Sequence, residues 1–313
     1  MKYLVIGAGG TGGAIAGFMS KAGKDVTVIA RGRHLAAMRQ DGLHFETPTG
    51  AYTVPVKACT MEEYAARDEV ADVIFVCVKG YSLEETVSFI AKIADSHSVV
   101  IPILNIYGTG RKMQEQLPQL HVTDGCIYIA SQIKEPGTIL MSGTIFRIVF
   151  GLRKDADATL HTLLHPVLSQ VEKDLAEAGI TPLYSKQIEK DALQKFSFVS
   201  PMAAAGAAYE ITAKDMQAGG AYENTYISLV QEIKLLSDAM DVSLPEDIVD
   251  INKKIMAGLA PDATASMQRD ILDGKASEVD GLVYEVVRLG EAFGVELPTY
   301  RAVSEKLRAL LAE

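Results

Sequence analysis

Residues 1–33 constrain the fold of this 313-residue chain more than any other stretch. Residues 2–6 (KYLVI) are an apolar run typical of a buried strand, and the glycine-rich residues 7–12 (GAGGTG) follow at once. A helix is expected from residue 13 to about residue 22, and a second strand over residues 25–29 (DVTVI). The pattern G-x-G-x-x-G between a strand and a helix, with another strand soon after, is typical of a dinucleotide-binding fold.

Three glycines of this turn have separate roles in such a fold. Gly7 permits the tight turn, Gly9 lets the backbone approach a pyrophosphate, and Gly12 lets the helix pack on the strand. The N–H groups at the helix start would hold the phosphate charge. The residues expected to bind a cofactor in this turn are Gly7, Ala8, Gly9, Gly10, Thr11 and Gly12. The alternative is a turn that binds no ligand.

The residues after the second strand indicate which dinucleotide is bound. NAD-dependent proteins usually place an acidic residue there for the ribose 2′-hydroxyl. This chain has Arg31 and Arg33 and no acid. A guanidinium suits a 2′-phosphate, because it offers forked hydrogen bonds and positive charge. NADP(H) is therefore the favoured cofactor, with Arg31 or Arg33 on the 2′-phosphate, unless both arginines are only solvated loop charges.

Composition restricts the class of protein. The chain is long enough for two domains, and 48% hydrophobic with 22% charged residues is typical of a globular protein. The net charge of −10 argues against a nucleic-acid partner, and no apolar run reaches membrane-spanning length. Cys59, Cys77 and Cys126 lack metal-site spacing, so no metal is expected. Because the first strand begins at residue 2, no signal peptide is expected and a cytoplasmic location is favoured.

Strands and helices alternate in the first half of the chain, and helices dominate the second. Ser82 and Glu85 predict a capping box at a helix start. A hairpin is expected over 42–56, strands over 72–78, 98–104, 122–130, 138–150 and 180–184, and helices over 34–41, 60–67, 82–93, 109–116, 156–178, 186–208, 221–240, 245–257, 276–293 and 299–312. The predicted fold class is α/β, with an N-terminal Rossmann-type doubly wound sheet and an all-helical C-terminal domain. The predicted domains are residues 1–184 and 185–313.

Five polar positions are candidates for chemistry. Lys79 and Asn105 follow two predicted strands, where open α/β sheets bind ligands, although polar residues often end strands for no functional reason. Lys195 begins an apolar helical run, where a lysine either extends to solvent or acts in a cleft. Ser266 lies in the stretch SMQRD, and Glu278 precedes a predicted helix, whose dipole alone could favour an acid there.

These residues together resemble the ketopantoate reductase family, the 2-dehydropantoate 2-reductases, over essentially the whole chain. The matching positions are residues 7–12, Val78–Lys79, Asn105, Lys195–Phe196, residues 266–270 and residues 278–280. The resemblance implies NADPH-dependent reduction of 2-dehydropantoate (ketopantoate) to pantoate in pantothenate biosynthesis. It also implies an NADP-binding N-terminal domain, a helical substrate and catalytic domain, and an active site in the cleft between them.

The resemblance also implies a role for each candidate residue. Lys195 would stabilise the ketone oxygen of the substrate and donate a proton to it. Asn105 would hold the nicotinamide and the substrate, and Ser266 would bind a substrate carboxylate or hydroxyl. Glu278 would bind the cofactor and orient Lys195. Lys79 could reach the adenosine phosphate or the nicotinamide ribose.

The chain also departs from the family. Val199 and Ala203 stand where the family commonly has asparagines, and Ile106 stands where it has a glycine after Asn105. A more apolar pocket is expected, which leaves the exact 2-keto acid open. A dehydrogenase of another type, a related 2-keto acid reductase and a non-catalytic NADPH sensor are the alternatives. The expected partners are a small-molecule 2-keto acid and, since the helical half has apolar faces, a second copy in a homodimer.

Overall fold

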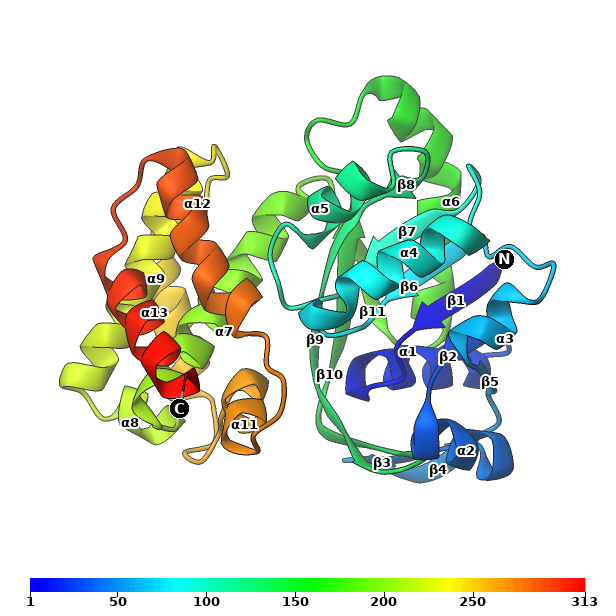
Figure 1. Ribbon diagram of the computed structural model, residues 1–313, viewed down its shortest axis with the longest axis horizontal. Helices are drawn as coiled ribbons and strands as arrows, with labels where there is room; N and C mark the ends of the chain where they lie inside the picture. Colours follow the sequence, from blue (N-terminus) through cyan, green and yellow to red (C-terminus); the bar gives the residue numbers. More distant parts are fainter. Residues whose placement is uncertain (313) are drawn as a thin grey trace. The chain divides into compact units, whose positions relative to one another are not determined.

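The protein is described by a computed structural model over residues 1–312, and it divides into two compact units (Figure 1). The N-terminal unit comprises residues 1–104 and 108–188. The C-terminal unit comprises residues 105–107 and the chain from residue 189 onward. The boundary predicted at residue 185 lies in the connection that leads into this second stretch. The predicted α/β class is confirmed: a Rossmann-type sheet occupies the N-terminal unit, and the C-terminal unit is helical.

The main sheet of the N-terminal unit has six parallel strands in the order β5-β2-β1-β6-β7-β8. These strands are β1 (Lys2–Ile6), β2 (Asp25–Ile29), β5 (Lys57–Cys59), β6 (Val73–Val76), β7 (Val99–Pro102) and β8 (His121–Val122). Alternate residues face opposite sides, so Tyr3 and Val5 join one buried cluster while Leu4 and Ile6 join another. Both faces are therefore buried, which explains why the strands read as continuous apolar runs.

Helices cover both faces of this sheet. The helices of this unit are α1 (Gly10–Lys21), α2 (Gly32–Asp41), α3 (Met61–Ala65), the short η1 (Gly80–Ser82), α4 (Leu83–Ile93), α5 (Thr109–Gln116) and α6 (Ala158–Glu177). Buried residues of α1 and α6 belong to one apolar cluster, and those of α3, α4 and α5 belong to the other. This arrangement is the doubly wound architecture that the strand–helix alternation predicts.

A second, mixed sheet packs on the other side of α1 and was not predicted. Its strands are β3 (Leu43–Thr47), β4 (Gly50–Val54), β9 (Asp124–Glu135), β10 (Thr138–Gly151) and β11 (Thr181–Tyr184). The ring of Phe18 on α1 meets Phe45 and Phe146 of this sheet edge-on, at 5.7 and 5.0 Å between ring centroids. Because α1 is covered on both sides, its residues from Gly12 to Gly17 are buried.

Three local predictions need correction. The capping box at Ser82 is wrong, because Ser82 has φ −102° and ψ 8° and its side chain makes no cap hydrogen bond. An N-cap needs extended backbone, whereas Ser82 already ends the turn of η1. The helix predicted from residue 13 begins at Gly10, and the one predicted from residue 34 begins at Gly32.

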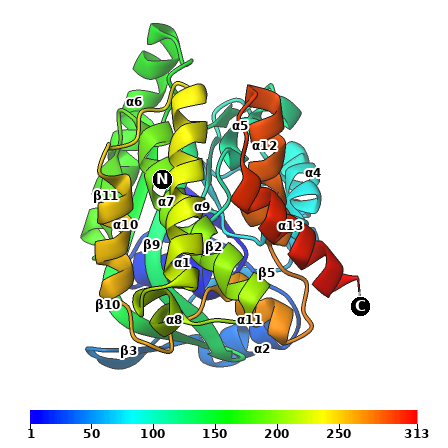
Figure 2. The same ribbon diagram turned by 90° about the vertical axis from the view of Figure 1, so that its left-hand side faces the viewer.

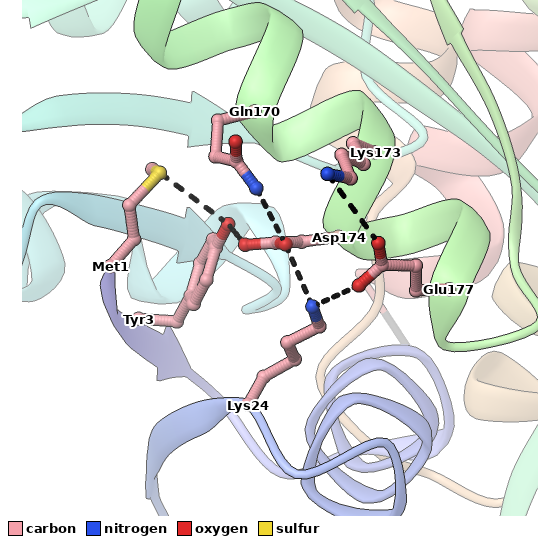
Figure 3. Close-up of polar contacts among 7 residues, drawn as sticks. All are labelled: Met1, Tyr3, Lys24, Gln170, Lys173, Asp174 and Glu177. Atoms are coloured by element: carbon pink, nitrogen blue, oxygen red, sulfur yellow. Dashed lines mark hydrogen bonds and ion pairs between the residues drawn. The ribbon is translucent and has the colours of Figure 1, made fainter.

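A buried acidic residue fastens α6 to the amino end of the main sheet (Figure 3). Asp174 accepts hydrogen bonds from the Tyr3 hydroxyl at 2.6 Å, the Lys24 ammonium at 2.8 Å and the Gln170 amide at 2.9 Å. Lys24 also contacts Glu177, at 2.5 Å. Burial opposes ionisation of Asp174, but these hydrogen bonds outweigh it, and its pKa lies below the ordinary value.

The C-terminal unit is a bundle whose central helix is α9, which contacts α8, α10, α12 and α13 (Figure 2). Its helices are α7 (Ile188–Tyr209), α8 (Ala213–Gln217), α9 (Ala221–Ala239), α10 (Ile248–Ala257), α11 (Ser266–Leu272), the π-helical turn η2 (Asp280–Tyr284), α12 (Glu285–Phe293) and α13 (Pro298–Leu311). The buried carboxylate of Glu232 accepts from the N–H groups of Thr299 and Tyr300, at 2.7 and 2.9 Å, and so caps α13.

Within residues 1–312, no helix combines the length and the apolar character needed to cross a membrane.

Candidate functional site

The glycine turn of the N-terminal unit is held against two strands. Gly7 has φ +99°, and its N–H donates to the Ile29 carbonyl at 3.2 Å. A Cβ atom at Gly7 would lie 2.8 Å from the Cys77 carbonyl oxygen, and one at Gly12 would lie 1.9 Å from the Gly7 carbonyl oxygen. Both positions therefore exclude a side chain, for reasons of backbone conformation at Gly7 and close packing at Gly12.

Gly9 differs, because neither packing nor conformation requires a glycine there. Its φ and ψ are −65° and −173°, which any residue adopts, and a Cβ atom would meet nothing within 4 Å. The missing side chain leaves the backbone open at the start of α1. The first N–H groups of a helix lack acceptors within that helix, and α1 has no acidic residue in its first turn. The turn fits an anion such as a pyrophosphate.

The predicted phosphate-binding arginines stand at the start of α2. Arg31 is the exposed N-cap residue of this helix, and Arg33 is exposed in its first turn. The first turn of α2 contains no acidic residue. An anion at this position would meet a helix amino end and two guanidinium groups.

Lys79 and Cys77 follow β6, beside the glycine turn. The N–H of Cys77 donates to the Ile6 carbonyl at 2.8 Å, which places this strand end next to Gly7. Burial raises the pKa of the Cys77 thiol far above its ordinary value, which disfavours the reactive thiolate. Lys79 is half-buried, and its carbonyl accepts from Ser82 N–H at 2.9 Å.

In the C-terminal unit, Lys195 and Asn105 meet directly. The Lys195 ammonium on α7 donates to Oδ1 of Asn105 at 2.6 Å, although 90 positions separate the two residues in the chain. The neighbours of Asn105 hold it there. The ring of Tyr107 lies 6.1 Å from that of Phe196, and Ile106 fits against Gly281, where a Cβ atom would lie 2.4 Å from Cδ1 of Ile106.

This arrangement places a defined positive charge in the C-terminal unit. An ammonium group has three donors, and the bond to Asn105 uses one of them. The carboxamide orients the ammonium without cancelling its charge, since the amide is neutral. Such a group can stabilise a developing oxyanion and transfer a proton to it.

Glu278 and Ser266 differ in how the structure places them with respect to Lys195 and Asn105. Glu278 is only 4% exposed, and its carbonyl accepts from Leu282 N–H at 3.0 Å, in the turn that contains Gly281. Glu278 is therefore one helical turn from the residue on which Ile106 packs. Ser266 is half-buried at the first position of α11. No hydrogen bond joins Ser266 to Lys195 or Asn105 in the part of the chain that the structure describes.

Two of the three positions at which the sequence departs from the family, Val199 and Ala203, lie on α7. Val199 is half-buried against the core of the C-terminal unit, and Ala203 is fully buried in it. Ala203 contributes to packing of the bundle, where an asparagine side chain would need buried hydrogen-bond partners.

The fold and these two groups of residues define a class: an α/β protein with a Rossmann-type glycine turn and a helical unit that presents an oriented lysine. Two family descriptions match this chain, "Ketopantoate reductase PanE/ApbA" over residues 3–155 and "Ketopantoate reductase PanE/ApbA C terminal" over residues 187–311. The chain belongs to the ketopantoate reductase family of oxidoreductases, which confirms the resemblance drawn from its motifs.

Individual relatives are distant but match along their full length. An uncharacterized oxidoreductase of Bacillus subtilis is 25% identical, with 100% of each chain covered. A 2-dehydropantoate 2-reductase of Aquifex aeolicus is 23% identical over 99% of this chain and 96% of its own. Among solved structures, a ternary complex of D-mandelate dehydrogenase with NADH and anilino(oxo)acetate matches with a TM-score of 0.87 and 16% identity, covering 100% of this chain and 99% of the other. That last likeness shows the shared fold.

One polar contact in the first turn of α2 was missed by sequence reasoning. His34 stands beside Arg33, and its Nδ1 atom accepts a hydrogen bond from Gly137 N–H at 2.9 Å. The sequence assigns it to a helix start and offers no further signal, because its partner lies 103 positions away.

Proposed function

We propose that this protein is an NADPH-dependent reductase of a 2-keto acid, with 2-dehydropantoate reduced to pantoate as the favoured reaction. The observation that carries the proposal is the hydrogen bond between Lys195 and Asn105 in a member of this family. Two residues that the sequence nominates independently are in contact, and they form the oriented ammonium that ketone reduction needs.

The N-terminal unit would hold the cofactor. The turn from Gly7 to Gly12 fits the pyrophosphate, because the open backbone at Gly9 and the amino end of α1 suit an anion. Arg31 or Arg33 would bind the 2′-phosphate and favour NADP(H) over NAD(H). Lys79 would bind the adenosine phosphate or the nicotinamide ribose. We assign dinucleotide binding to the domain over residues 1–184, and substrate binding with catalysis to the domain over residues 185–313.

The proposed roles of Lys195 and its neighbours follow from the negative charge that develops on the ketone oxygen during reduction. Bound NADPH supplies a hydride for the ketone carbon. Negative charge then develops on the ketone oxygen, where the Lys195 ammonium stabilises it and donates a proton. Asn105 fixes the direction of that ammonium and would hold the nicotinamide or the substrate. Ser266 would bind the substrate carboxylate or hydroxyl, and Glu278 would bind the cofactor and orient Lys195. The three free cysteines agree with action in the reducing cytoplasm.

A reductase of a different 2-keto acid is the second candidate. Val199 and Ala203 remove two amide groups that would favour a hydroxylated substrate, and a dehydrogenase of mandelate, an aromatic 2-hydroxy acid, shares the fold. Because that dehydrogenase was solved in complex with NADH, NADH is the alternative cofactor for this protein. An NADPH-binding protein without turnover is the remaining alternative.

A screen of 2-keto acids against NADPH and NADH tests the proposal, with loss of reduced-cofactor absorbance as the readout. Ketopantoate should be consumed with NADPH, and the Arg31→Ala and Arg33→Ala variants should show which arginine sets the preference over NADH. Faster turnover of a branched or aromatic 2-keto acid would favour the second candidate. NADPH binding without consumption of any 2-keto acid would favour the sensor.

A further inference from the structure

A glycine of the C-terminal unit provides the seat for the residue that follows Asn105. A Cβ atom at Gly281 would lie 2.4 Å from Cδ1, 2.6 Å from Cγ1 and 3.0 Å from Cγ2 of Ile106. Because Gly281 lies in the helical turn η2, its backbone conformation does not require a glycine, whereas the contact with Ile106 does. Any side chain at position 281 would have to displace Ile106.

The turn that contains this seat is irregular. The N–H of Glu285 donates to the carbonyl of Asp280, five positions earlier, which is the spacing of a π-helix rather than an α-helix. Single π-helical turns within helices are rare and are frequent at functional sites. Contacts with the rest of the unit must hold η2 in this form, because its own hydrogen bonds do not continue along a regular helix.

A buried pair of hydroxyl groups supplies such a contact. The Ser200 hydroxyl on α7 donates to the carbonyl of Leu282 in η2, at 2.6 Å. Its oxygen also lies 2.6 Å from the Tyr300 hydroxyl on α13. A serine has one hydrogen to donate, so Tyr300 must be the donor in this second bond. Ser200 and Tyr300 are both fully buried, and these hydrogen bonds join α13, α7 and η2.

The seat and the proposed proton donor are linked through Asn105. This residue precedes Ile106 in the chain, and its Oδ1 accepts from the Lys195 ammonium at 2.6 Å. We propose that η2 is a positioning element for the reaction: Gly281 seats Ile106, Ser200 holds the turn, and the seated segment keeps the Asn105 carboxamide on Lys195. The inference rests on the proposed function, and it makes Gly281, Ile106 and Ser200 positioning residues that act through Asn105.

Complementary substitutions test this coupling. Gly281→Ala should displace Ile106 and lower turnover by about tenfold, since misplacement by about 1 Å can cost up to about 10²-fold. Ile106→Ala should lower turnover as well, because the empty seat no longer fixes Asn105. The double variant Gly281→Ala/Ile106→Ala should recover most of the turnover, because it lacks the three atoms that the added methyl group would meet. Steady-state kinetics with the 2-keto acid identified by the screen measure all three variants.

Gly290→Ala is the matched control for the inserted methyl group. Gly290 lies on α12 of the same unit, and a Cβ atom there would lie 2.6 Å from Cδ1 of Leu297. Both glycine variants should melt at a lower temperature, but only Gly281→Ala should turn over slowly when assayed well below its melting temperature. Equal turnover of these two variants would overturn the proposal, and so would a double variant as slow as the slower single one. If Gly281→Ala does not fold, normal turnover of Ile106→Ala overturns it.

Ser200→Ala tests the support beneath the turn. It removes the donor to Leu282 and should lower turnover. Ser237→Ala is its control, because Ser237 is also fully buried in the C-terminal unit and donates to a backbone carbonyl, that of Lys234, at 2.7 Å. This control should lower only the melting temperature. Normal turnover of Ser200→Ala would overturn the assignment of Ser200 as a positioning residue.

Nitrogen-15 NMR provides a readout that needs neither substrate nor cofactor. The signal of the Asn105 carboxamide, assigned by its loss in Asn105→Ala, should shift in Gly281→Ala and return towards its original place in Gly281→Ala/Ile106→Ala. It should stay unchanged in Gly290→Ala. An unshifted signal in Gly281→Ala would overturn the proposal. Failure of the unaltered protein to consume any 2-keto acid would instead refute the proposed function, so the two failures are distinct.

Discussion

Two lysines of this protein are held in contrasting ways. Lys24 of the N-terminal unit donates to two carboxylates, Asp174 at 2.8 Å and Glu177 at 2.5 Å (Figure 3). These hydrogen bonds raise its pKa, so its proton is firmly held and its charge is matched. Lys195 of the C-terminal unit donates to the neutral Asn105, at 2.6 Å. The amide orients the ammonium and brings no opposing charge of its own.

The contrast separates a structural lysine from the proposed catalytic lysine by the chemistry of the acceptor. A carboxylate partner stabilises the folded state, because the two charges attract in a partly buried setting. A carboxamide partner supplies direction alone, which is useful where negative charge develops only in a transition state. Each of the following predictions alters one side of this comparison.

The largest effect is expected from removal of the Lys195 ammonium, the proposed proton donor. Lys195→Ala should lower turnover by at least ~10²-fold, the usual scale for loss of a positioned acid, with little change in melting temperature. Steady-state kinetics with the 2-keto acid identified by the screen measure this change. Lys24→Ala is the matched control and should show the reverse pattern, with normal turnover and a lower melting temperature. Near-normal turnover of Lys195→Ala would remove Lys195 from the mechanism.

The next effect concerns the stability of the N-terminal unit. Asp174→Asn should lower the free energy of unfolding by about 2 kcal/mol at pH 7, because the hydrogen bonds to a charged acceptor are weakened. Denaturant unfolding measures the change. Exposed Asp68→Asn, in the same unit, is the control and should have almost no effect.

The pH dependence of this effect has a defined sign. The folded pKa of Asp174 is below its ordinary value of 3.8, so its contribution is complete above that pH and is lost as pH falls through the folded pKa. The folded pKa of Lys24 is above 10.5, so its contribution is complete below that pH and is lost at higher pH. The unaltered protein and Asp174→Asn should therefore converge in stability in strong acid. A difference that stays constant down to acid unfolding would contradict this assignment.

The smallest effect is expected when the acceptor of Lys195 is given a charge. Asn105→Asp would replace the neutral acceptor at this contact by a carboxylate, so turnover should fall by about tenfold because part of the ammonium charge is cancelled. A carboxylate also raises the pKa of a neighbouring lysine, so the loss of activity at high pH should move to higher pH. Rate profiles against pH measure both changes, with exposed Asn224→Asp as the control. A profile identical to that of the unaltered protein would show that the carboxamide of Asn105 does not govern Lys195.

Local sequence signals predicted much of the N-terminal fold. The strand at residues 2–6, the turn at Gly7 and the strand at residues 25–29 all appear where expected, because apolar runs and glycine patterns act over short distances. The second sheet was not predicted, since its register joins Thr138 to His44 through contacts that no local pattern encodes. Helices α8 and α11 were missed because five and seven residues are too few to show a helical period.

The candidate site shows the same division. Lys195 and Asn105 could each be nominated from position and residue type, but nothing in the sequence shows that residues 105–107 pack with the helical unit. His34 carried no signal at all, because its hydrogen-bond partner Gly137 lies 103 positions away in the chain.

Chemical rescue of Lys195→Ala tests the central claim most directly. Addition of methylammonium to this variant, with NADPH and the 2-keto acid at saturating concentrations, should restore turnover in proportion to amine concentration until the vacated position is filled. The unaltered protein should not respond to the amine. A rate for Lys195→Ala that is independent of methylammonium would contradict the assignment of an ammonium at position 195 as the proton donor to the ketone oxygen.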